Sequence, residues 1–230
     1  MDDKQLKSKQ RVTDHGEVFT AKREVNAMLD LVKQETERID SRFLEPACGT
    51  GNFLVEILKR KISVVENRYS KNQLDYERYA IIAISSIYGV DILLDNVQTC
   101  RDRLLGIFTH FYIKNYKNEF KPECLKSAEF ILSRNILWGD ALNLKTPDEK
   151  AEPIIFSEWS AVNGSMIKRR DFTLANLLEE DLLQYNDRKY KPNEIPLFSD
   201  EGDPAFLPQP IRDFPLIHFL KLGEDDTNEL

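Results

Sequence analysis

Apolar residues recur along this chain in two ways, at helical spacing within charged stretches and as short unbroken runs. Helical spacing marks one face of an amphipathic helix, whereas a short apolar run between turn residues is typical of a buried strand. The first pattern predicts helices in six segments: 21–39, 51–61, 72–86, 95–108, 126–133 and 173–185. The second predicts strands in three segments: 42–47, 87–92 and 135–141.

These strands alternate with helices, which indicates a mostly parallel sheet with helices on its faces, that is, a doubly wound α/β fold. A β-hairpin is predicted near 154–172, because Asn163-Gly164 separates two further β-like runs. An Asn-Gly pair tolerates the positive φ angles that a tight hairpin turn requires. Ligands of such parallel sheets bind beyond the carboxyl ends of the strands, so the residues that follow each strand are candidates for a site.

Composition divides the chain into three parts. Residues 1–20 are a polar N-terminal arm, residues 21–185 carry the periodic segments and form one domain, and residues 186–230 form a C-terminal extension. Six of the ten prolines lie in that extension, which is also acidic. Residues 199–230 hold eight acids and two bases, which accounts for six of the seven net negative charges. At 230 residues with 41% hydrophobic content, the chain is long enough for one sizeable core.

The same numbers bear on location and partners. No apolar run reaches the roughly 18 residues of a transmembrane helix, and the N-terminus lacks an apolar signal region, so a cytoplasmic protein without membrane contact is expected. Three cysteines and three histidines show no metal-ligand spacing, so no metal is expected. Basic clusters lie at 59–61, with Arg68 and Lys71 nearby, and at 168–170. They suit phosphate contacts and a solvated surface equally well.

The most informative segment follows the first predicted strand and reads Glu45-Pro46-Ala47-Cys48-Gly49-Thr50-Gly51-Asn52-Phe53. Glycine has no Cβ, so a Gly-x-Gly turn lets the backbone come close to a ligand. By itself such a turn suits NAD, FAD, S-adenosylmethionine or no ligand. Leu54 stands where the NAD fingerprint has its third glycine, and no Gly-Lys-Ser/Thr follows, so neither that fingerprint nor a P-loop is present.

The wording of this segment resembles the S-adenosylmethionine-binding motif of N6-adenine DNA methyltransferases from restriction–modification systems, in the motif order of type I modification subunits. The resemblance implies a Rossmann-like methyltransferase fold, S-adenosylmethionine as the cofactor and DNA as the substrate. Upstream, His15-Gly16-Glu17-Val18-Phe19-Thr20 resembles the family segment that precedes this motif. It implies that Phe19 and Thr20 contact the methionine end of the cofactor; Phe19 is otherwise an ordinary core residue.

Two later strand ends extend the resemblance. The acid of Val90-Asp91-Ile92 would accept hydrogen bonds from the ribose hydroxyls, unless Asp91 is a helix N-cap. The acid of Gly139-Asp140-Ala141 would bond the adenine amino group, unless Asp140 merely forms a turn. The cofactor-binding residues that the resemblance implies are Phe19, Thr20, Glu45, Pro46, Ala47, Cys48, Gly49, Gly51, Asn52, Phe53, Asp91, Ile92, Asp140 and Ala141.

The resemblance breaks at the catalytic motif, because the Asn/Asp-Pro-Pro-Tyr/Phe of these enzymes occurs nowhere in the chain. In its place stands Ser157-Glu158-Trp159-Ser160, where Trp159 would stack on a flipped base and Glu158 would accept a proton. Trp159 is otherwise a core or interface residue. Three functions stay open: a divergent DNA adenine-N6 methyltransferase, a split or inactive cofactor-binding module of a restriction or defence complex, and an RNA or small-molecule methyltransferase. A second methyltransferase subunit or a specificity subunit would be the partner in the first two.

Overall fold

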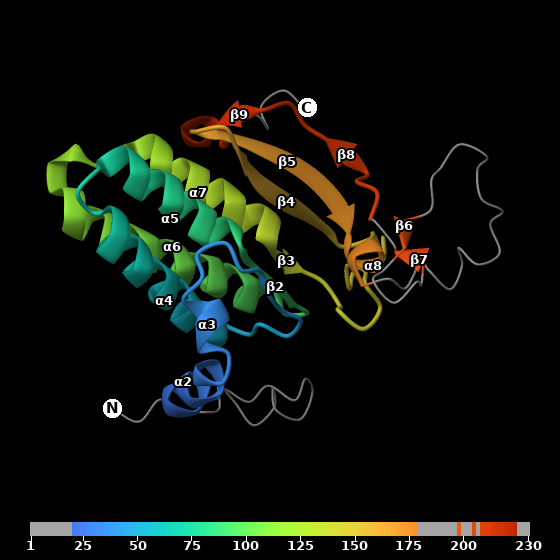
Figure 1. The fold of residues 1–230 in the computed structure, drawn as a ribbon. Helices are drawn as coiled ribbons and strands as arrows, with labels where there is room; N and C mark the ends of the chain where they lie inside the picture. Colours follow the sequence, from blue (N-terminus) through green and yellow to red (C-terminus); the bar gives the residue numbers. More distant parts are fainter. Residues whose placement is uncertain (1–19, 179–196, 199–203, 206–207, 225–230) are drawn as a thin grey trace.

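The computed structural model describes residues 20–178, 197–198, 204–205 and 208–224. At its centre lies a parallel three-stranded sheet in the order β1-β2-β3 (Figure 1). The strands are β1 (Phe43–Glu45), β2 (Ile87–Asp91) and β3 (Ile136–Trp138). Each lies within a segment that the apolar runs predict, and all three point their carboxyl ends to one edge of the sheet.

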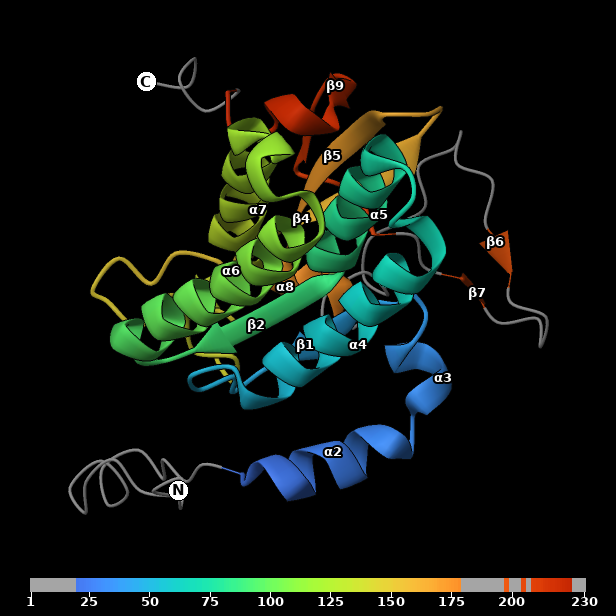
Figure 2. The same cartoon turned by 90° about the vertical axis from the view of Figure 1, so that its left-hand side faces the viewer.

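Helices cover one face of this sheet and an antiparallel hairpin covers the other (Figures 1 and 2). The helices are α4 (Asn52–Tyr69), α5 (Gln73–Ser85), α6 (Leu94–Tyr116) and α7 (Pro122–Asn135). The hairpin is formed by β4 (Ile155–Val162) and β5 (Met166–Thr173). The α/β class and the hairpin near 154–172 are therefore confirmed.

The alternation of side chains along β2 explains the two layers. Ile87 packs into the core that the helices form, whereas Tyr88 and Val90 pack into a second, smaller core with Phe156. The Tyr88 hydroxyl also donates to the carbonyl of Ser157 at 3.1 Å. A doubly wound sheet has helices on both faces; in the described part of the chain, the hairpin takes the place of the second helical layer.

Smaller elements complete the described fold. The N-terminal side carries α2 (Lys22–Asp30) and α3 (Lys33–Thr36), and α6 ends in the 3-10 turn η1 (Lys117–Glu119). After the hairpin come α8 (Leu174–Leu177), β6 (Leu197–Phe198), β7 (Pro204–Ala205), β8 (Arg212–Asp213), β9 (Ile217–His218) and η2 (Phe219–Lys221). Both β8 and β9 pair with β5, so part of the C-terminal extension belongs to the antiparallel sheet.

Several predicted helix boundaries are wrong. The predicted helix 21–39 is broken at Leu31 and Val32, which form an exposed turn. The helix after Gly51 extends beyond Lys61 to Tyr69, since buried Ile62 and Val65 continue its apolar face. Two later helices, α6 and α7, are also longer than predicted: α6 continues past Phe108 over buried Tyr112, and α7 begins at Pro122. Of the predicted helix 173–185, only the first turn is helical within the described residues.

A lysine lies buried where α4 packs on the segment that leads into β1. Lys61 is 0% exposed, and its Nζ donates to the carbonyls of Ile39 (3.1 Å) and Ser41 and to the hydroxyl of Ser86 (2.5 Å). Burial lowers the pKa of Lys61 from the ordinary 10.5 to about 7, although the nearby Asp40 opposes the shift. Three acceptors match the three donors of an ammonium group, so the site can bind the charged form. Loss of hydration nevertheless disfavours that form.

We expect the charge of Lys61 to destabilise the folded protein less as the pH rises. Between pH 7 and 10.5 the unfolded chain binds a proton at Lys61 that the folded chain has released, so the free energy of unfolding increases with pH. Below pH 7 Lys61 is protonated in both the folded and the unfolded chain, so the folded protein bears the full cost of burying the charge. The stability of the wild type relative to Lys61→Met should rise by about 2 kcal/mol from about pH 6 to about pH 9. Urea unfolding of both proteins measures it; a pH-independent difference would contradict the lowered pKa.

Candidate cofactor-binding site

The residues that follow the three parallel strands line one cavity of about 590 Å³. It therefore lies at the carboxyl edge of the sheet, where α/β proteins bind ligands. The residues predicted from the sequence that line it are Thr20, Glu45, Pro46, Ala47, Cys48, Gly49, Asn52, Phe53, Asp91, Ile92, Asp140 and Ala141. Gly51 shapes the loop without lining the cavity, and Phe19 lies outside the described residues.

The glycine-rich loop folds as a tight turn between β1 and α4. Gly49 and Gly51 have φ angles of 51° and 85°, a region that residues with a Cβ rarely adopt. The Gly51 amide donates to the Cys48 carbonyl at 2.8 Å, and the Cys48 amide donates to the Val90 carbonyl at 2.8 Å. Gly51 is the N-cap of α4, whose first residues, Asn52 and Phe53, line the cavity. The loop is thus fixed between two strands, with its backbone exposed to the cavity.

Asp91 connects the loops that follow β1 and β2. Its Oδ2 accepts from the Gly49 amide at 2.8 Å, and its Oδ1 accepts from the Leu93 amide at 2.9 Å and from Asn96 Nδ2 at 3.2 Å. The N-cap of α6 is Leu93, so Asp91 is not the N-cap. A carboxylate has about four acceptor positions. Three are used here, which leaves Asp91 one position for a donor in the cavity.

Asp140 has the geometry of a turn aspartate. Its Oδ1 accepts from the Leu142 amide at 2.9 Å, and its Oδ2 accepts from Asn143 Nδ2 at 2.5 Å. The residue is nevertheless half-buried and lines the cavity. The turn interpretation is therefore confirmed, whereas the bond to an adenine amino group stays a prediction for a side chain that lines the cavity.

Arg103, which the sequence does not predict as a site residue, hydrogen-bonds to the glycine-rich loop. Arg103 on α6 donates through Nη1 to the Thr50 carbonyl (2.6 Å), the Thr50 hydroxyl (3.1 Å) and Asn52 Oδ1 (2.8 Å). Asn52 in turn donates to the Thr20 carbonyl at 3.2 Å, which attaches the N-terminal segment to the loop. Arg103 lies 52 positions after Gly51, and an arginine on a charged helix gives no sequence signal of such a contact. Asn96, buried beside Asp91, is missed for the same reason.

The charges around the cavity select a class of ligand. Among the described residues, three carboxylates line it, those of Glu45, Asp91 and Asp140, and no lysine or arginine does. Burial raises the pKa of the Glu45 carboxyl. The N-terminal end of α4 supplies partial positive charge at one place only. This arrangement favours a ligand with hydroxyl groups, a positive charge and a single carboxylate, and it disfavours a di- or triphosphate.

The two weak catalytic candidates lie elsewhere. Glu158 pairs with Arg42 (2.6 Å) and Arg170 (3.1 Å). Trp159 is 7% exposed, and its Nε1 donates to Asn135 Oδ1 at 2.9 Å, just before β3 begins. Neither residue lines the 590 Å³ cavity. Trp159 instead packs against Phe130, near the amino ends of the strands. The structure therefore places Trp159 in the core, as the alternative interpretation had it.

The basic cluster at 168–170 is engaged in ion pairs within the hairpin and β8. Lys168 pairs with Asp213, and Arg170 pairs with Glu158. Arg169 is 4% exposed and forms a bidentate pair with Asp171. The prediction of phosphate contacts or a solvated surface is wrong for Arg169, because β4 and β5 turn it toward the protein interior.

Comparison with family models, with curated proteins and with solved structures finds no match to this chain. Within the described ranges, no helix combines the length and the apolar character needed to cross a bilayer. The same residues contain no group of three or more His, Cys, Asp or Glu side chains placed to hold a metal ion. The geometry of the cavity is therefore the basis for assigning a function.

Proposed function

We propose that the chain binds S-adenosylmethionine in this cavity and supplies the cofactor-binding part of a DNA adenine-N6 methyltransferase. One observation carries the proposal: three separate strand-end segments, around Gly49, Asp91 and Asp140, line a single cavity whose charged residues, in the part of the chain that the structure describes, are all acids. A glycine turn by itself suits several ligands. Three motifs of one family converging in the expected order support that family's cofactor.

Each part of the cofactor has a complementary group. The carboxylates of Glu45 and Asp91 suit the ribose hydroxyls and the cationic methionine end, and Asp140 suits the adenine amino group. The open N-terminus of α4 suits the methionine carboxylate. Phe53, Ile92 and Ala141 supply apolar surface for the adenine ring. When bound, the sulfonium supplies the methyl group for transfer.

The chain's own contribution is binding and orientation. Asp91 and Arg103 hold the glycine loop in one conformation from opposite sides, so the cofactor would meet a preorganised surface. The described residues place no catalytic candidate of the sequence in the cavity. This favours, as the second candidate function, a cofactor-binding module whose target-binding residues come from a partner subunit.

Replacing Glu45 with glutamine should weaken cofactor binding about tenfold, because a charged acceptor is lost. Glu45 lines the cavity and the substitution keeps its shape, so the fold should be unaffected. Titration calorimetry with S-adenosylmethionine measures the change. Glu37→Gln is the matched control, since Glu37 is exposed at the opposite edge of the sheet. Equal affinities in Glu45→Gln and wild type would remove Glu45 from the site.

The methyltransferase part of the proposal is tested by transfer of tritiated methyl to unmethylated bacterial genomic DNA. Incorporation into adenine by the purified chain would show a complete enzyme with an unrecognised catalytic group. A protein that binds the cofactor without incorporation would support the partner-dependent module. A protein that binds no cofactor would refute both forms of the proposal.

A further inference from the structure

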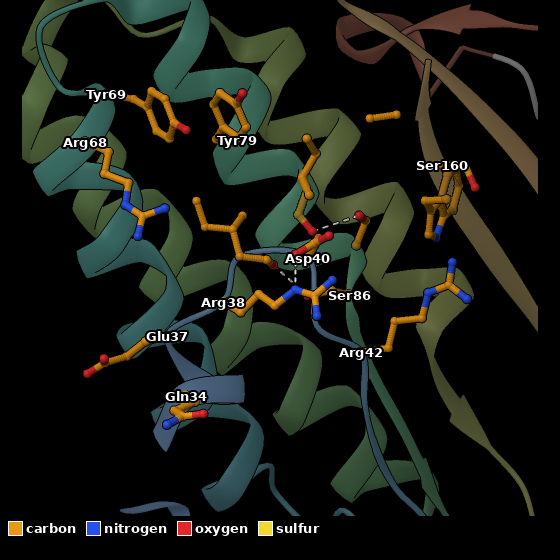
Figure 3. Close-up of a pocket in the computed structure, with 15 residues that line it drawn as sticks. Gln34, Glu37, Arg38, Asp40, Arg42, Arg68, Tyr69, Tyr79, Ser86 and Ser160 are labelled. Atoms are coloured by element: carbon orange, nitrogen blue, oxygen red, sulfur yellow. Dashed lines mark hydrogen bonds and ion pairs between the residues drawn. The ribbon is translucent and has the colours of Figure 1, made fainter. Parts of the chain in front are cut away.

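A second cavity, of about 770 Å³, lies at the opposite edge of the sheet (Figure 3). Its walls come from the segment between α3 and β1, from the end of α4, from α5 and from β4. It borders Arg42, just before β1, and Ser86, just before β2, so it lies at the amino ends of the strands. No residue lines both this cavity and the cofactor cavity.

Three guanidinium groups border this second cavity, two from the segment between α3 and β1 and one from the end of α4. They belong to Arg38, Arg42 and Arg68 (Figure 3). Arg38 pairs with Asp40 at 3.0 Å, but both side chains are 62% exposed, so the pair is weak and can give way to a ligand. Arg68 forms no ion pair with any described residue. Arg42 pairs with Glu158 at 2.6 Å, a pair whose arginine is 56% exposed. Glu37 and Asp40 are the acids that line this cavity, whereas three acids line the first cavity.

Lys61 lies directly beneath the floor and adds a fourth positive charge when it is protonated. The Nζ of Lys61 donates to the carbonyl of Ile39 and to the hydroxyl of Ser86, both of which line the cavity. Lys61 is fully buried, so its charge is poorly screened by solvent. The arginines at the rim and the lysine below the floor therefore favour an anion in this space. Guanidinium groups match the geometry of phosphate in particular.

Aromatic rings form another wall. Tyr69 from α4 and Tyr79 from α5 stack with their centroids 3.9 Å apart and their planes at 10° (Figure 3). Arg78 lies over the Tyr79 ring at 5.2 Å, whereas no other described ring stacks on Tyr69. Both tyrosines line the cavity, so a planar base within it would pack against this aromatic wall. Base stacking on tyrosine together with phosphate contacts to arginine is how proteins hold single nucleotides without reading their sequence.

We propose that this second cavity binds a nucleotide, with its phosphate between Arg38, Arg42 and Arg68 and its base against Tyr69. The ligand is a nucleoside monophosphate, either free or as the terminal unit of a single strand. The site does not depend on the proposed function of the first cavity, because the two have different residues and lie at opposite ends of the parallel strands.

The test is titration calorimetry with adenosine monophosphate, adenosine and a 5′-phosphorylated tetrathymidylate. The wild type should bind the monophosphate and should bind adenosine at least about tenfold more weakly. Arg68→Gln should weaken binding of the monophosphate about tenfold, whereas the exposed Arg23→Gln on α2 should leave it unchanged. Tighter binding of the oligonucleotide than of the monophosphate identifies a strand end as the source.

Binding in the first cavity must be kept apart from this result. The monophosphate should bind equally well to Glu45→Gln and in the presence of saturating S-adenosylmethionine. Competition with S-adenosylmethionine, or equal losses in Arg68→Gln and Arg23→Gln, would overturn the proposal, as would the absence of saturable binding of both phosphorylated probes. If the wild type bound the monophosphate but not S-adenosylmethionine, the proposal for the first cavity would be refuted and the proposal for the second would stand.

Discussion

Asp171→Ala should lower the free energy of unfolding by about 4 kcal/mol, the largest effect that we expect from a single substitution. Asp171 and Arg169 are 3% and 4% exposed, and two hydrogen bonds of 3.0 Å join the carboxylate to the guanidinium. Asp171 Oδ1 also accepts from Ser157 Oγ at 2.7 Å. The substitution removes the carboxylate to which the buried Arg169 guanidinium donates both of these bonds. Urea unfolding followed by circular dichroism measures the loss.

Asp213→Ala is the matched control for this experiment. Asp213 lies on β8, next to β5, and pairs with Lys168, but its side chain is 54% exposed. Exposed ion pairs are worth at most about 1 kcal/mol, so this variant should unfold almost as the wild type does. Equal losses in Asp171→Ala and Asp213→Ala would show that burial of the Arg169–Asp171 pair does not matter to stability.

Gly51→Ala should lower the free energy of unfolding by about 3 kcal/mol and abolish cofactor binding. Two costs add. The φ angle of 85° is unfavourable for any residue with a Cβ, and that Cβ would lie 2.5 Å from Cys100 Sγ on α6. Cys100 is fully buried, so relief of the contact is expected to shift the loop that lines the cavity, and the two effects should appear together. Thermal unfolding and S-adenosylmethionine calorimetry on the same sample measure both.

Two other glycines separate these costs. Gly164 in the hairpin turn also has a positive φ, 72°, but an added Cβ would meet nothing within 4 Å. Gly164→Ala should therefore show the backbone cost alone, about 1 kcal/mol. Gly106 lies in α6 with open space around it, so Gly106→Ala should be neutral or slightly stabilising. If Gly51→Ala lost no more stability than Gly164→Ala, the contact with Cys100 would not constrain the loop.

Local sequence signals predict the parts of the fold that depend on local chemistry. The three parallel strands appear as short apolar runs, and Asn163-Gly164 marks the hairpin turn, where both residues have positive φ angles. The loop around Gly49 and the acid Asp91 are predicted because a strand end fixes their position in any parallel sheet. Such features need no knowledge of which distant elements pack together.

The features that the sequence does not predict depend on distant partners. Arg103 on α6 hydrogen-bonds to the glycine-rich loop, which lies about 50 positions earlier in the chain. Lys61 is buried against Ile39 and Ser86, which lie more than 20 positions away on either side of it. Arg169 belongs to a basic cluster in the sequence, but its side chain is buried in the protein. The second cavity joins segments from Gln34 to Ala161 that share no motif. Only the fold brings these groups together, so periodicity and composition do not reveal them.

Hydrogen exchange of the whole chain, with and without saturating S-adenosylmethionine, tests the cofactor site most directly. Binding should slow exchange of the backbone amides in three segments: 45–53, 91–96 and 139–142. Exchange around 34–42, at the opposite edge of the sheet, should not change. Protection confined to that opposite edge, or no protection in any of the three segments at saturation, would contradict the account.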